Sequence, residues 1–293
     1  MTSKPLIKTN ILQDDQLDTY GNPKPVEMGH GLFYKYKSLA PEVLPHTIEI
    51  IKDRKIFCPK PSQTNDKDEE FKPPVTAGDY SNPIYRARVQ QWVRRIATRS
   101  NPQASEAEIL NQLSILSQES LEGYAKQLEP EYHSEIENQY RLLSLSDIPD
   151  NHHLWVNYAD DYAGICFQFF FTPKFSTVYR VNYVQSRPNW DLVCDQEMET
   201  LSATALTKLE KWRDEREFRM VISEPPLPYG PILVNQKLDL PIEAFAGIYL
   251  GQRISPANKT LILDLAKQYL PLVPIYEVTN NSSGLKPSIK QIS

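Results

Sequence analysis

The sequence predicts an α+β fold with a mixed, largely antiparallel sheet, flanking helices and a helical insertion. Segments with strand-like composition, such as Ile165–Phe171 and Glu217–Ile222, are spread along the chain. Few helical segments long enough for a parallel crossover separate them. The stretch from Ile84 to about Tyr140 instead carries apolar residues at helical spacing. Together these features favour antiparallel strand pairing around one core.

The chain is predicted to form one domain with two additions. Residues 1–30 are polar and contain Pro5, Pro23 and Pro25, which indicates an irregular N-terminal arm. Residues 31–293 contain the strand signals of a single α+β domain. A helical insertion is expected at about 81–145.

The bulk composition is typical of a soluble globular chain. The 293 residues are 40% hydrophobic and carry a formal net charge of -5. An acidic balance gives no support to broad binding of nucleic acid, which requires a basic surface. No apolar run is long enough to span a membrane. Cys58, Cys166 and Cys194 lie far apart, so we expect reduced thiols and a cytoplasmic location. The oligomeric state is left open.

The core is predicted to open with a strand, a helix and a second strand. The aromatic run Leu32–Tyr36 favours a strand, and its alternation places Phe33 and Lys35 on one face. The helix is expected from Pro41, and the second strand at Lys55–Cys58.

The insertion is predicted to contain two helices. The first has an apolar stripe and a neighbouring line of arginines at Arg88, Arg95 and Arg99. Such a line is typical of a surface helix that pairs with nearby carboxylates, which we favour, or of a nucleic-acid contact. The second helix is expected from the capping box at Ser105 to Pro130.

Later segments alternate between predicted helices and strands. Trp155 and Tyr158 have helical spacing, and Ile165–Phe171 reads as a strand buried on both faces. Val178–Val184 is expected to be its hairpin partner. The remaining predicted elements are a strand at Ala246–Leu250, a helix at Ser255–Gln268 and a last strand at Val273–Val278.

The stretch Leu209–Ile222 is the candidate site. A helical pattern from Met198 to Trp212 is followed by a strand in which Glu217 and Arg219 share one face. Phe218, Met220 and Ile222 are assigned to the core on the opposite face. Carboxylates on a rigid edge suit a site, although Glu217 and Arg219 also fit an ion-pair ladder.

Four segments, taken in order, resemble the bacterial domain-of-unknown-function family 2971 (DUF 2971). They are LFYKYKSL, PSQTNDKDEEF, LWVNYADDYAGICFQF and KWRDEREFRMV. The chain departs from the family pattern at Lys67 and Asp68, and at Asn157, where the family often has histidine. The layout also resembles that of ADP-ribosyltransferase-like folds.

This resemblance implies a nucleotide-handling or NAD-handling enzyme, such as a toxin or defence effector. Glu217 would stabilise an oxocarbenium-like transition state, and Glu215 would orient the nucleophile or act as a base. Tyr36 or Tyr158 would stack on the nicotinamide, and Lys35 or Arg219 would meet the phosphates. The residues expected to contact the nucleotide are Lys35, Tyr36, Asn65, Tyr158 and Arg219.

Two further expectations complete the sequence-based view. The acidic loop Pro61–Phe71 lacks the spacing of a calcium loop, and no metal is expected. The alternative function is a non-catalytic module that recognises protein or nucleic acid through Arg88, Arg95 and Arg99. An enzyme requires the candidate residues to converge on one pocket, whereas a binding module does not.

Overall fold

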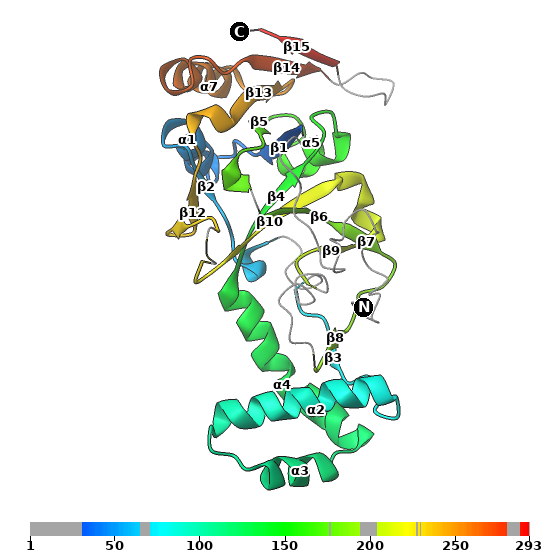
Figure 1. Ribbon diagram of the computed structural model, residues 1–293. Helices are drawn as coiled ribbons and strands as arrows, with labels where there is room; N and C mark the ends of the chain where they lie inside the picture. The colour runs from blue at the N-terminus through cyan, green and yellow to red at the C-terminus, as the bar shows by residue number, and fades with distance from the viewer. Residues whose placement is uncertain are drawn as a thin grey trace.

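An eight-stranded sheet forms the centre of the molecule (Figure 1). The computed structural model describes residues 31–64, 71–175, 177–193, 204–226, 228, 230–279 and 288–292. The predicted arm over 1–30 and Cys194 lie outside these ranges. Cys58 and Cys166 are buried free thiols.

The sheet confirms the predicted α+β class. Neighbouring strands are antiparallel, except that β13 and β14 are parallel. In spatial order they are β15 (Ser288–Gln291), β14 (Ile275–Thr279), β13 (Phe245–Gly251), β5 (Ile165–Phe170), β1 (Leu32–Lys37), β4 (Tyr140–Ser146), β10 (Glu217–Ser223) and β6 (Val178–Arg180).

Three small sheets surround the large one. β2 (Lys55–Phe57) joins β12 (Lys237–Asp239) and β11 (Leu233–Val234). The others pair β3 (Val75–Thr76) with β8 (Trp190–Asp191), and β7 (Asn182–Val184) with β9 (Thr207–Leu209).

Helices cover both faces of the large sheet. Apolar residues of α1 (Leu44–Lys52) and α7 (Pro256–Tyr269) pack on one face with Phe33, Phe167 and Ile248. α5 (His152–Tyr158) packs on the opposite face, where Trp155 is fully buried. The predicted helix beginning at Ser255 is confirmed, because the Ser255 side chain caps α7.

The helical insertion extends from the sheet (Figure 1). α2 (Pro83–Ser100) and α3 (Glu106–Ser114) lie at the end away from β13–β15, and α4 (Gln118–Gln139) returns to β4. Tyr85, Val89 and Trp92 are buried as predicted, but Ile96 is 41% exposed.

The second predicted helix of the insertion is wrong in its C-terminal end. The capping box at Ser105 starts α3, but the helix ends at Ser114 because Ser117 caps a new helix, α4. α4 then continues through Pro130, although proline lacks an N–H and so removes one helical hydrogen bond. The helix is held on either side of Pro130 by the buried residues Leu121 and Ile136. The helical stretch predicted to about Tyr140 ends at Gln139, and the strand β4 that follows it was not predicted.

Two later predictions also need correction. The run Val178–Val184 does not pair with β5, because β1 and β13 occupy both edges of β5. It is divided instead between β6, which pairs with β10, and β7, which pairs with β9. The predicted helix ending at Trp212 is replaced, in the described part, by β9 and a 3₁₀ helix at Glu210–Glu215. A strand is favoured because β7 supplies a pairing edge.

Candidate functional site

A cavity of about 400 Å³ opens where β1 and β4 separate. These central strands are paired at a single position, Tyr34 opposite Ser146. Further along β4, the Leu142 N–H donates to the Pro59 carbonyl, so the segment after β2 takes the place that β1 leaves. The four successive residues Tyr34–Lys37 line the cavity. Since successive strand residues face opposite sides, the cavity follows the open edge of β1.

The lining combines charged side chains with aromatic rings. Four basic and two acidic side chains line it: Lys35, Lys37, Lys208, Arg219, Glu215 and Glu217. His46 and Phe57 also line it, with ring centroids 6.4 Å apart. In a chain of net charge -5, this local excess of cations favours an anionic ligand.

Glu217 lies at the centre of a buried ionic network. Arg219 places Nε 3.0 Å from Glu217 Oε1 and Nη2 2.9 Å from Oε2, and its Nη1 donates to the Ala205 carbonyl at 2.6 Å. Lys208 Nζ lies 3.2 Å from Glu217 Oε2. All three side chains are at most 4% exposed. Both oxygens of the carboxylate are therefore satisfied by cations.

Glu215 shares Lys208 with Glu217. Its Oε2 accepts a hydrogen bond from Lys208 Nζ at 2.7 Å, and its Oε1 accepts one from the half-buried Tyr158 hydroxyl at 3.0 Å. His153 Nε2 lies 3.8 Å from the same Oε1. Lys208 thus holds the two carboxylates together, and Tyr158 joins this pair to α5.

The turn before β10 is fixed by backbone contacts. Arg216 adopts a left-handed conformation (φ 48°, ψ 50°) that turns the chain from the 3₁₀ helix into the strand. The Ser146 hydroxyl donates to the Glu215 carbonyl at 3.0 Å, and the Glu217 N–H donates to the Tyr183 hydroxyl at 2.8 Å. Both glutamates are therefore carried on a rigid junction.

The network sets the charge of Glu217. Burial alone would raise the pKa of its carboxyl, but Arg219 and Lys208 outweigh burial and lower the pKa to about 2. Glu217 is consequently a fixed anion at neutral pH.

The ammonium group of Lys35 has a lowered pKa. It donates to the Ser144 carbonyl at 2.8 Å. Burial, assisted by the nearby charge of Lys37, lowers the pKa of Lys35 to about 8. Lys35 therefore changes charge close to neutral pH.

The structure brings most of the predicted site residues together. Lys35, Tyr36, Tyr158, Glu215 and Glu217 line one cavity, and so does Arg219. Arg219 is 3% exposed and engaged by Glu217 and Ala205, so it anchors the carboxylate and is not available to phosphates. Asn65 lies outside the described residues.

Tyr36 lines the same cavity, but its ring packs in the core, and its stacking role stays a prediction. Its ring is 6% exposed and lies edge-on to Trp155, with centroids 5.3 Å apart. Its hydroxyl donates to the Ile148 carbonyl at 2.8 Å. Tyr36 is a core residue of the α5 side because both its ring and its hydroxyl are already occupied there.

Lys208 and the His46–Phe57 pair were not recognised from the sequence. Lys208 falls inside the stretch that was assigned to a helix, so its position on a strand beside β7 was hidden. His46 and Phe57 come from α1 and β2, whose relative placement depends on tertiary packing. Only the strand-like alternation of Thr207–Leu209 could have pointed to Lys208.

The arginine line of α2 is divided between two environments. Arg88 forms an ion pair with Asp191 at 3.1 Å, in agreement with the predicted pairing to a nearby carboxylate. Arg95 and Arg99 line an open surface hollow with Arg94, and Arg94 pairs with Glu106. The three predicted arginines therefore do not form one basic surface.

The described ranges contain neither a group of three or more His, Cys, Asp and Glu side chains placed to hold a metal ion, nor a helix long and apolar enough to cross a bilayer. No family model, curated protein or solved structure matches this chain.

Proposed function

We propose that this protein is an intracellular enzyme that binds NAD or a related nucleotide in the β1–β4 cavity and cleaves its nicotinamide–ribose bond. The observation that carries the proposal is the convergence of Lys35, Tyr158, Glu215 and Glu217 on one cavity with an excess of cations. The resemblance to the domain-of-unknown-function family 2971 and to ADP-ribosyltransferase-like layouts supports it.

The cavity offers each part of such a ligand a chemically suitable neighbour. Phe57 and His46 provide flat rings for a base. Lys35 and Lys37 provide positive charge for a diphosphate. Tyr158, half-buried and hydrogen-bonded to Glu215, replaces Tyr36 as the aromatic neighbour of the nicotinamide end.

Glu217 and Glu215 have different roles in the proposed reaction. As the bond between the nicotinamide nitrogen and ribose C1′ breaks, its electron pair leaves with nicotinamide and positive charge develops on the ribose. The fixed anion Glu217 stabilises that charge. Water or another acceptor adds its oxygen to C1′ and gives its proton to Glu215.

Release of nicotinamide from NAD tests the proposal. The wild-type protein should release nicotinamide, and NAD at millimolar concentration should raise its melting temperature. Glu217→Gln should lower the rate by about 100-fold or more when assayed well below its own melting temperature. Absence of both cleavage and thermal stabilisation in the wild type would contradict the proposal.

The charge-balanced variant Glu217→Gln/Arg219→Gln separates catalysis from folding. It removes the carboxylate without leaving Arg219 unpaired, so its stability should exceed that of Glu217→Gln while its activity stays low. Activity that recovers together with stability would assign Glu217 a structural role.

A further inference from the structure

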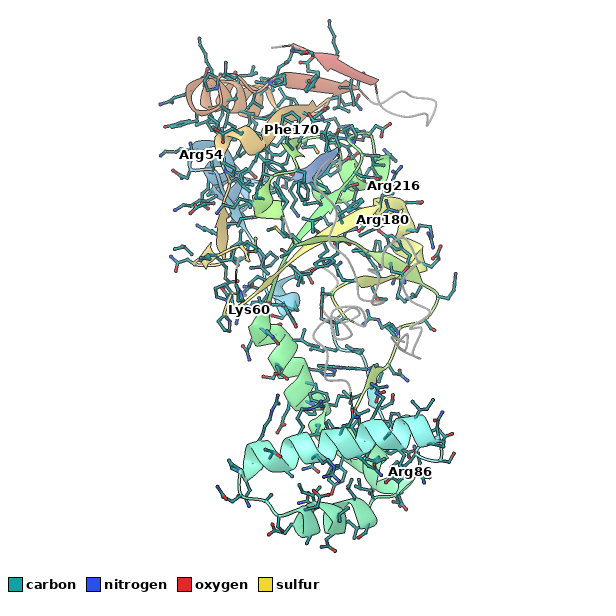
Figure 2. The ribbon with its side chains drawn as sticks, viewed as in Figure 1. Arg54, Lys60, Arg86, Phe170, Arg180 and Arg216 are labelled. Atoms are coloured by element: carbon teal, nitrogen blue, oxygen red, sulfur yellow. The ribbon has the colours of Figure 1, made fainter. Side chains whose placement is uncertain are left out.

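A second cavity, of about 230 Å³, lies beside the first at the β6 edge of the sheet. Its walls include Arg180, Arg213 and Arg216, together with Asp147 and Tyr183. Glu217 lines both cavities. Figure 2 shows Arg180 and Arg216 near one another on this side of the molecule. The three guanidinium groups come from β6, from the 3₁₀ helix and from the turn before β10.

The arginines retain hydrogen-bond donors for a ligand. Arg213 uses Nε and Nη2 for Glu210, and Arg216 uses Nη2 for Asp147 at 2.6 Å. Each guanidinium carries five N–H donors, so most donors of Arg216 and several of Arg213 are left over. Arg180 stacks on Phe218, with its guanidinium carbon 5.5 Å from the ring centroid. Within the described ranges it has no carboxylate partner.

The backbone at Arg216 supports a role for its side chain. A left-handed conformation is unfavourable for a residue with a long side chain, and asparagine or glycine adopts it at lower cost. An arginine here places its guanidinium beside the cavity at that energetic cost. Residues held in such conformations cluster at ligand sites.

We propose that this second cavity binds a phosphate group of a second ligand, with Arg180, Arg213 and Arg216 as its contacts. Planar guanidinium groups match phosphate oxygens in pairs. The assignment concerns binding alone and does not rest on the proposed reaction. Because Glu217 lines both cavities, a phosphate-bearing second substrate in the second cavity would lie next to the first.

Calorimetric titration with inorganic pyrophosphate tests this site. Arg180→Gln and Arg216→Asn should each weaken binding by roughly tenfold. Asparagine tolerates the left-handed conformation, so Arg216→Asn should fold normally. Arg86→Gln is the matched control, because Arg86 also stacks on an aromatic ring, that of Tyr80 at 5.3 Å. It lies on α2, far from Arg180 (Figure 2).

Lys35→Gln separates the two cavities. Lys35→Gln should leave intact the pyrophosphate binding that Arg180→Gln weakens. The proposal is overturned if pyrophosphate does not bind, if its binding is lost in Lys35→Gln but kept in Arg180→Gln, or if Arg86→Gln weakens it equally. Pyrophosphate binding without NAD cleavage would support the second binding site and contradict the proposed reaction. Cleavage with unchanged pyrophosphate binding in Arg180→Gln would do the reverse.

Discussion

Arg219 donates hydrogen bonds to both carboxylate oxygens of Glu217. Glu217 precedes Arg219 by two residues and lies on the same face of β10. The sequence left open whether this pair formed a ladder between strands or a site. The pair lies within one strand, and other elements add partners: Lys208 of β9 and the Ser144 side chain of β4 bond Glu217, and the Ala205 carbonyl accepts from Arg219. The same contacts that fix Glu217 for chemistry also make it part of the core.

Breaking this pair should be costly for folding. We expect Glu217→Gln and Arg219→Gln each to lower the free energy of unfolding by roughly 3–5 kcal/mol, because each leaves a buried charge without its bidentate partner. The double variant should lose clearly less than the sum of the two. Urea denaturation of the four proteins measures this coupling. Additive losses would contradict the pairing.

Acidification should weaken the fold through Glu217. Its pKa is lowered from 4.5 to about 2, so its stabilising contribution is complete above pH 4.5 and is lost as the pH falls toward 2. Melting temperatures measured between pH 7 and 3 should fall more steeply for the wild type than for Glu217→Gln/Arg219→Gln. Parallel curves would show that other carboxylates govern acid unfolding.

Anion binding in the first cavity should weaken as the pH rises through about 8. Lys35 is charged below its lowered pKa of about 8 and neutral above it, so its attraction for a phosphate fades at alkaline pH. Affinity for ADP-ribose, measured between pH 6.5 and 9.5, should fall in the wild type. Lys35→Arg stays charged and should give a flat profile. An equal fall in both proteins would exclude Lys35 as the cause.

A methyl group at Gly164 should displace Lys37, which lines the first cavity. An added Cβ would lie 2.3 Å from the Lys37 carbonyl oxygen, at the end of β1. Gly164→Ala should therefore destabilise the protein by more than 1 kcal/mol (roughly) and weaken ligand binding. Gly123→Ala, in α4 and without neighbours within 4 Å, should instead stabilise by about 0.5–1 kcal/mol. Equal effects of the two variants would contradict this.

The strands whose own residues show a strand-like composition were predictable from the sequence. β1, β5, β10 and β13 lie at predicted positions because aromatic or β-branched residues fill them and buried faces fix their register. β4 was missed because its sequence, YRLLSLS, directly follows a helix and is buried on both faces. Only its last four residues, Leu143–Ser146, alternate at the strand period, and Tyr140–Leu143 do not differ in pattern from the end of a helix.

The site was predictable where it depends on one strand and not where it depends on packing. Alternation alone placed Glu217 and Arg219 on the face opposite Phe218, and the structure confirms it. That Tyr36 faces Trp155, and that Lys208 reaches Glu215, depends on contacts between elements distant in space or wrongly assigned. No local pattern encodes those contacts.

The large sheet consists of two halves that are joined by a single paired position between β1 and β4. One half contains β15, β14, β13, β5 and β1, and the other contains β4, β10 and β6. Across the middle, Tyr34 opposite Ser146 is the only ladder position within the described chain, beside the Lys35 to Ser144 hydrogen bond. A ligand bound in the first cavity would contact β1 and β4, and would therefore connect the two halves of the sheet. Amide hydrogen exchange in β1 and β4 should then slow together when the cavity is filled.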